Sequence, residues 1–72
     1  MDAPDTTEFE HATRHVAEAE ERCAGQRALI ERMAAAGQDT AQAESVLLQL
    51  EKTLDLLRWH QQRLRQSSQN RS

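Results

Sequence analysis

The three histidines are the side chains whose spacing comes nearest to a metal-binding set. His11 and His15 are four residues apart, so they share one face of a helix. Glu8 precedes His11 by one turn, and His60 lies level with His15 if the chain folds back near residue 38. Tetrahedral Zn²⁺ accepts such nitrogen and carboxylate ligands. We favour the other interpretation, that these histidines are solvated residues beside a helical seam, and we expect no cofactor.

Cys23 is the only cysteine, so no disulfide can form within the chain. A buried free cysteine usually packs as a small hydrophobic side chain, and we predict that role here in preference to a redox role or an interchain disulfide. The sequence contains neither a Ser-His-Asp grouping with a plausible pocket nor a glycine-rich phosphate loop. We therefore predict a protein that is not an enzyme.

The composition points to long helices. The chain has 72 residues, of which 38% are hydrophobic and 3% aromatic, with two glycines and one proline. Strong helix formers dominate, and turn residues are too few for a β-sandwich or barrel. A chain this short usually needs disulfides, a metal or oligomerisation to be stable. Self-association is therefore expected from size alone.

One break divides the helical pattern. Three alanines at 34–36 run into Gly37, a residue suited to the left-handed position that ends a helix. Asp39 or Thr40 then offers an N-cap oxygen, and Asp39 with Gln42 resembles a capping box. We predict a first helix over about 5–36, a turn at 37–39, a second helix over about 40–66 and a frayed tail at 67–72. So short a turn makes the helices antiparallel neighbours.

Apolar residues recur in both helices at alternating steps of three and four, the pattern of a coiled-coil seam. The first helix contributes mostly small residues and the second mostly leucines, so the two interdigitate. Gln26 either fixes the register or marks a thin point of the seam, and Gln61 indicates loosening toward the tail. The predicted seam residues are Phe9, Val16, Cys23, Ile30, Met33, Leu47, Leu50, Leu54, Leu57 and Leu64.

Leu48, Leu56 and Trp59 fall outside that seam. At about 100° per residue they gather on a second face of the second helix. Single exposed leucines are ordinary surface features, but a lone hairpin would leave all three side chains uncovered. We therefore predict an all-α fold, an antiparallel two-helix hairpin that dimerises into a four-helix bundle through this face.

Charge is unevenly distributed. The formal net charge is −3, which argues against general nucleic-acid binding. Residues 1–36 hold eight acidic and four basic residues, and residues 37–72 hold four acidic and five basic ones. In a hairpin folded near residue 38, residue i lies level with about residue 76 minus i. We thus expect Glu8 to pair with Arg65 and Glu10 with Arg63, each pair contributing little but together favouring this register.

The segment 36–44, with Leu47, Leu50 and the run Arg58-Trp59-His60, resembles small bacterial helical-hairpin proteins of uncharacterised function, of a proteobacterial type. Together with 15–18 and 26–30, the resemblance covers most of the chain. It implies the hairpin and a bacterial cytoplasmic setting, and it implies no activity and no site residues.

The expected function is that of a small self-associating structural or interaction module. Its expected partners are a second copy and, as a further option, another helical protein. Two alternatives remain: a nucleic-acid-linked regulator that uses the arginine-rich C-terminal end, and a metal-binding hairpin that uses His11, His15 and His60. Without a run of 18 apolar residues or an N-terminal apolar segment, we expect no membrane association and a cytoplasmic location.

Overall fold

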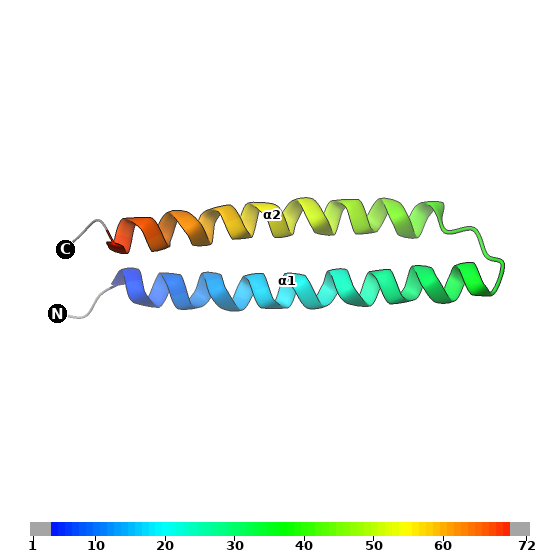
Figure 1. Ribbon diagram of the computed structural model, residues 1–72, viewed down its shortest axis with the longest axis horizontal. Helices are drawn as coiled ribbons and strands as arrows, with labels where there is room; N and C mark the ends of the chain where they lie inside the picture. The colour runs from blue at the N-terminus through cyan, green and yellow to red at the C-terminus, as the bar shows by residue number, and fades with distance from the viewer. Residues whose placement is uncertain (1–3, 70–72) are drawn as a thin grey trace.

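The computed structural model describes the backbone of residues 4–69 and the side chains of residues 7–66. Two helices, α1 (Pro4–Ala35) and α2 (Ala41–Gln69), run antiparallel and pack along their lengths (Figure 1). The result is a rod of 57 × 15 × 12 Å. The predicted all-helical hairpin is confirmed.

At the turn, both helices begin or end close to the expected residues. At the C-terminal end, α2 extends beyond the expected residue. Helix α1 ends at Ala35, and α2 continues to Gln69, three residues past the expected 66. Residues 67–69 contain no glycine or proline, so nothing in them stops the helix. Residues 70–72 of the expected frayed tail lie outside the described part of the chain.

Gly37 ends α1 in the way its sequence context predicts. Its φ is +75°, in the left-handed region. The Gln38 amide donates to the Met33 carbonyl at 2.8 Å, and the Gly37 amide donates to the Ala34 carbonyl at 3.0 Å. These two bonds are the Schellman arrangement, which satisfies carbonyls at the end of a helix.

The start of α2 is capped by one side chain. The Asp39 Oδ1 atom accepts a hydrogen bond from the Ala41 amide at 2.9 Å, which satisfies a backbone donor of the first turn. The Thr40 hydroxyl donates to the Glu44 carboxylate at 2.8 Å, a contact between two side chains. Among the described residues, Gln42 makes no side-chain hydrogen bond that would complete the expected capping box with Asp39.

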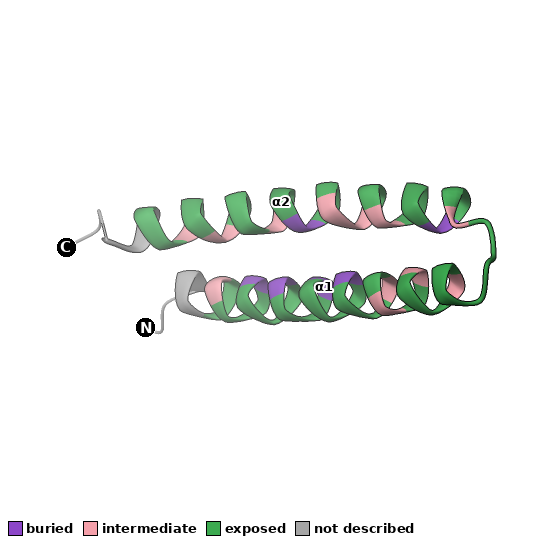
Figure 2. Ribbon diagram, turned by 45° about the vertical axis from the view of Figure 1, so that its right-hand side comes forward, coloured by how far each residue is buried: buried purple, intermediate pink, exposed green. Residues whose placement is uncertain are grey.

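The core is a narrow stripe between the helices (Figure 2). Cys23 is its centre, with 1% of its surface exposed, and it packs as a small apolar residue beside Val16 and Leu54. All ten predicted seam positions are buried or half-buried. Of the residues whose side chains are described, the buried ones are Ala12, Val16, Ala19, Cys23, Ala43 and Leu54. Small side chains from α1 thus meet larger ones from α2.

The two polar residues of the seam both bond across it. The Gln26 amide donates to the Ala43 carbonyl at 2.9 Å, and the Gln61 amide donates to the Thr13 hydroxyl at 2.9 Å. Leu64, beyond Gln61, is still half-buried. Gln61 thus has a polar partner on α1, while the seam residues of α2 after the buried Leu54 are only half-buried. The looser packing predicted toward the tail stays a prediction.

The two glycines provide a matched test of the turn. A Cβ atom added at Gly37 or at Gly25 would meet no atom within 4 Å, so only the backbone conformation distinguishes the two sites. Gly37→Ala should lower the free energy of unfolding by about 1–2 kcal/mol because of its positive φ. Gly25→Ala, inside α1, should raise it by about 0.5–1 kcal/mol. Circular dichroism melts at equal protein concentration measure both, and effects of the same sign would contradict the turn geometry.

Candidate interaction surfaces

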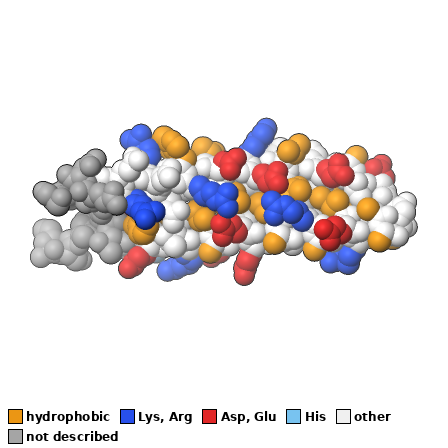
Figure 3. Space-filling model, in the orientation of Figure 1, with side chains coloured by type: hydrophobic (Ala, Val, Ile, Leu, Met, Phe, Trp, Pro, Cys, Tyr) orange, Lys and Arg blue, Asp and Glu red, His pale blue; other side chains and the backbone are white. Residues whose placement is uncertain are grey.

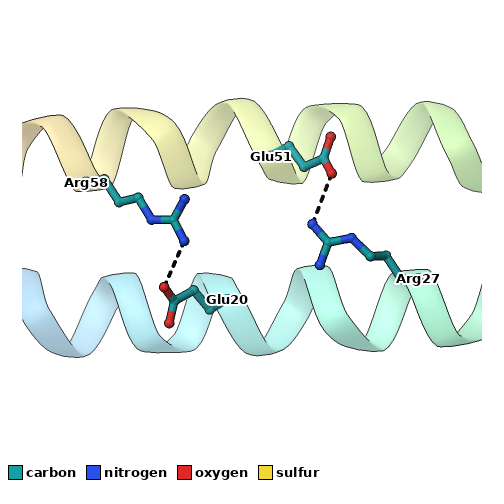
Figure 4. A network of polar contacts seen from close by, with 4 residues as sticks. All are labelled: Glu20, Arg27, Glu51 and Arg58. Atoms are coloured by element: carbon teal, nitrogen blue, oxygen red, sulfur yellow. Dashed lines mark hydrogen bonds and ion pairs between the residues drawn. The ribbon is translucent and has the colours of Figure 1, made fainter.

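One flank of the seam is closed by ion pairs. Arg58 donates to the Glu20 carboxylate at 2.9 Å, and Arg27 donates to the Glu51 carboxylate at 3.1 Å (Figure 4). Acidic and basic side chains accordingly gather between the two helices on this face of the molecule (Figure 3). In both pairs the residue numbers sum to 78, so the register lies within two residues of the expected one. We call this flank the charged groove.

The charged groove contains a hollow of about 290 Å³ above Cys23 and Leu54. Ligand sites of this size usually present a few polar groups that converge on the ligand. Here the guanidinium and carboxylate groups of the rim bond to one another across the helices. The groove therefore joins the helices and offers no set of polar groups directed at a small molecule.

The expected pairs of Glu8 with Arg65 and of Glu10 with Arg63 do not form. Among residues 7–66, the ion pairs are those of the charged groove, and Arg63 lies over the Trp59 ring with its guanidinium carbon 5.0 Å from the ring centre. At about 100° per residue, Glu10 and Arg63 point away from the seam on their helices. In the observed register Glu10 also lies level with about residue 68, so Arg63 is displaced from it along the rod.

Arg58 is opposed by Glu20 from α1. Glu20 and Arg58 each lie next to the seam on the same side of the hairpin, so their side chains reach each other. Each pair is about half exposed, and such pairs contribute below about 1 kcal/mol. They refine the register without supplying most of the stability.

The three histidines are exposed. In the part of the chain that the structure describes, no three His, Cys, Asp or Glu side chains are placed so that they could hold a metal ion. His11 and His15 share a helix, but His60 and Glu8 do not complete a ligand set with them. The structure gives the metal-binding alternative no support.

Leu48, Leu56 and Trp59 project from α2 into solvent, with 59%, 68% and 57% of their surfaces exposed. Their azimuths at about 100° per residue place them on the side of α2 opposite the seam. Arg63 covers part of the Trp59 ring, a contact that the sequence pattern alone did not identify. We call the side of α2 that carries these three residues the outer face.

A smaller apolar patch lies beside the seam, on the flank opposite the charged groove. It consists of Leu29 from α1 and Val46 from α2, which are 37% and 45% exposed. The two residues lie nearly level in the observed register. They widen the seam, and they are fewer and less exposed than the residues of the outer face.

Compared with protein-family models, with curated proteins and with solved structures, the chain gives no match. Of the two helices described, neither has a stretch apolar and long enough to cross a bilayer. The outer face is therefore interpreted from its own chemistry.

The charged groove is tested by exchanging one of its pairs. Arg27→Glu and Glu51→Arg each place like charges opposite one another, so each should lower the free energy of unfolding by about 0.2–1 kcal/mol. The double exchange should recover most of the loss. Both effects should shrink in high salt, because exposed charges are screened. Urea unfolding at two salt concentrations measures this, and losses that simply add in the double variant would contradict the pairing.

Proposed function

We propose that this hairpin is a self-associating helical interaction module, in which the outer face of α2 packs on a second copy. The observation that carries the proposal is the outer face itself: three large apolar side chains, each more than half exposed, on a helix that already buries its opposite side. Single exposed apolar residues are normal on a surface, but here three of them lie on one side of one helix, which favours an interaction site. No catalytic step is part of the proposal.

The thinness of the hairpin core supports self-association. Leu54 and Val16 are the largest buried apolar side chains of the described residues, and the others are alanines and Cys23. Full burial of a large apolar side chain contributes about 1.5–3 kcal/mol. Leu48, Leu56 and Trp59 are a little over half exposed, so covering them would add about 3–5 kcal/mol for each chain. That is a large share of the stability of an ordinary small domain, about 5–15 kcal/mol.

The position of the outer face determines how two hairpins would meet. Because it lies opposite α1, contact through it puts the two α2 helices in the middle and the two α1 helices outside. The predicted four-helix bundle then takes the form of a layer of four helices. This arrangement accounts for the compositions: α2 has leucines on two faces, and α1 has one small-residue face with charged residues around the rest.

The nucleic-acid alternative is less well supported. Arg58 is engaged by Glu20, and Arg63 lies over Trp59, so two arginines of the C-terminal cluster already have partners. The net charge of −3 also opposes an approach to phosphate. The free thiol of Cys23 is compatible with a reducing, cytoplasmic setting, and we retain that location within the proposal.

Self-association makes stability depend on protein concentration. Light scattering at micromolar concentration should give a dimer mass, and the melting temperature should rise with concentration because assembly stabilises the folded chain. The double variant Leu48→Glu/Trp59→Glu places charges in the contact. It should be monomeric, with a lower melting temperature that does not change with concentration.

A matched control separates the outer face from a general effect of charge. Ala17→Glu/Ala24→Glu adds the same two negative charges at exposed positions of α1, which lie outside the proposed contact, and should leave the dimer intact. A wild-type chain that is well folded and monomeric at these concentrations would contradict self-association. The outer face would then be the docking surface for a different helical protein.

A further inference from the structure

We infer that the second copy packs antiparallel on the outer face, so that Leu48 lies opposite the partner's Trp59 and Lys52 opposite the partner's Asp55. This inference rests on the proposed self-association and names its geometry. It comes from the order of side chains along the middle of the outer face.

A second stripe of alternating three- and four-residue steps runs along the middle of the outer face. Such steps keep side chains on one side of a helix and are the spacing of a coiled-coil contact. All six members are exposed in the hairpin. In chain order they are Ser45, Leu48, Lys52, Asp55, Trp59 and Gln62. The stripe is therefore polar at both ends, apolar one layer further in, and charged at its centre, with one basic and one acidic residue.

An antiparallel copy places this stripe against its own reverse. The residue numbers of facing positions then add up to 107, with the two-fold axis between residues 53 and 54. Leu48 meets the partner's Trp59, Lys52 meets the partner's Asp55, and Leu56 lies beside this stripe on the flank away from the charged groove. Ser45 meets the partner's Gln62 at both ends. The two-fold axis repeats every contact, as in an isologous interface.

Other arrangements of the same stripe match poorly. An antiparallel copy shifted by one heptad would put Leu48 against the partner's Lys52, or Trp59 against the partner's Asp55. A parallel copy would put Lys52 level with the partner's Lys52, and like charges facing each other are destabilising. The unshifted antiparallel arrangement is the one that joins apolar contact with matched charge.

Charges on one flank of the outer face favour the same arrangement. Glu44 and Arg65 both lie on the flank next to the charged groove, near opposite ends of the face, and both are exposed. Antiparallel helices related by a two-fold axis bring equivalent flanks together, so Glu44 comes within two positions of being level with the partner's Arg65. A hollow of about 560 Å³ opens on this flank; its lining includes Trp59, Arg65 and Asp55 as well as the paired Arg58 and Glu20. Glu44 of the second copy would approach it beside Arg65.

Cysteine cross-linking tests the direction and the register. Ser45→Cys and Gln62→Cys are made separately in a Cys23→Ala background, mixed and oxidised, and the products are identified by intact mass. Positions 45 and 62 are 17 residues apart, about 26 Å along α2. In the antiparallel dimer a disulfide can therefore join only the two different variants. The mixed dimer should exceed either self-linked dimer by about tenfold or more.

As a control, light scattering must first show that the Cys23→Ala chain has the same oligomeric state as the wild type. The other possible cross-linking results can then be told apart. Self-linked dimers of both variants would mean a parallel pair and would overturn the inference. Dimers that form no disulfide would also overturn it, because the second copy would then lie in another register or on another surface, such as the Leu29 and Val46 patch. A monomeric wild type would overturn the proposed function as well.

Charge exchange gives an independent test without cysteine. Glu44→Arg and Arg65→Glu should each raise the dimer dissociation constant about three- to tenfold, because the symmetric contact places like charges together twice. The double variant should recover most of that loss. Since the two positions are 21 residues apart, about 32 Å along α2, recovery reports contact between chains. Losses that multiply in the double variant, with no recovery, would overturn the inferred register.

A control isolates the role of Glu44 within its own chain, where its carboxylate accepts the Thr40 hydroxyl. Thr40→Val removes that hydrogen bond and leaves the charge of Glu44 in place. It should lower the melting temperature of the hairpin but change the effect of Arg65→Glu on the dissociation constant by less than about twofold. A Thr40→Val chain in which Arg65→Glu no longer weakens the dimer would overturn the contact between Glu44 and the partner's Arg65.

Discussion

The close approach of a small-residue face of α1 to the leucines of α2 is the constraint on which the rest of the hairpin depends. Each helix has one neighbour, so every buried contact of the described chain lies in this single interface. Cys23 is almost fully buried because Leu54 reaches it between small neighbours such as Ala19. A bulkier residue at Cys23 would push the helices apart, and overpacking of this kind is destabilising.

The features at the edge of the seam follow from that approach. Helices this close bring the flanking positions within reach, which allows Arg27 to meet Glu51 and Arg58 to meet Glu20. The same proximity lets Gln26 donate to a backbone carbonyl of α2. These polar contacts favour one register over its neighbours. The seam also determines which side of α2 remains exposed, because the outer face is whatever the packing with α1 leaves uncovered.

The hairpin and its seam could be predicted because each depends on local periodicity. Heptad spacing identifies the facing residues, and Gly37 after three alanines identifies the turn. The ion pairs could not be predicted in the same way. The uneven charge along the sequence indicates only which residues could lie at a similar height along the rod. A contact also requires that both side chains point to the same side of the hairpin. Glu10 and Arg63 satisfy neither condition in the observed register, because Glu10 lies level with about residue 68, and Glu20 and Arg58 satisfy both.

The turn at Gly37 also determines how the rod would respond to force. The free ends of α1 and α2 lie together at the end opposite the turn (Figure 1), so tension applied to the two ends of one chain acts across the first seam layer alone. The two helices would separate one seam layer at a time, starting from the layer of Phe9 and Leu64. Tension carried from one hairpin to an antiparallel second copy would instead act along the contact, where all layers resist at once. The same turn thus makes a single chain weak to peeling, whereas the proposed antiparallel pair would resist shear.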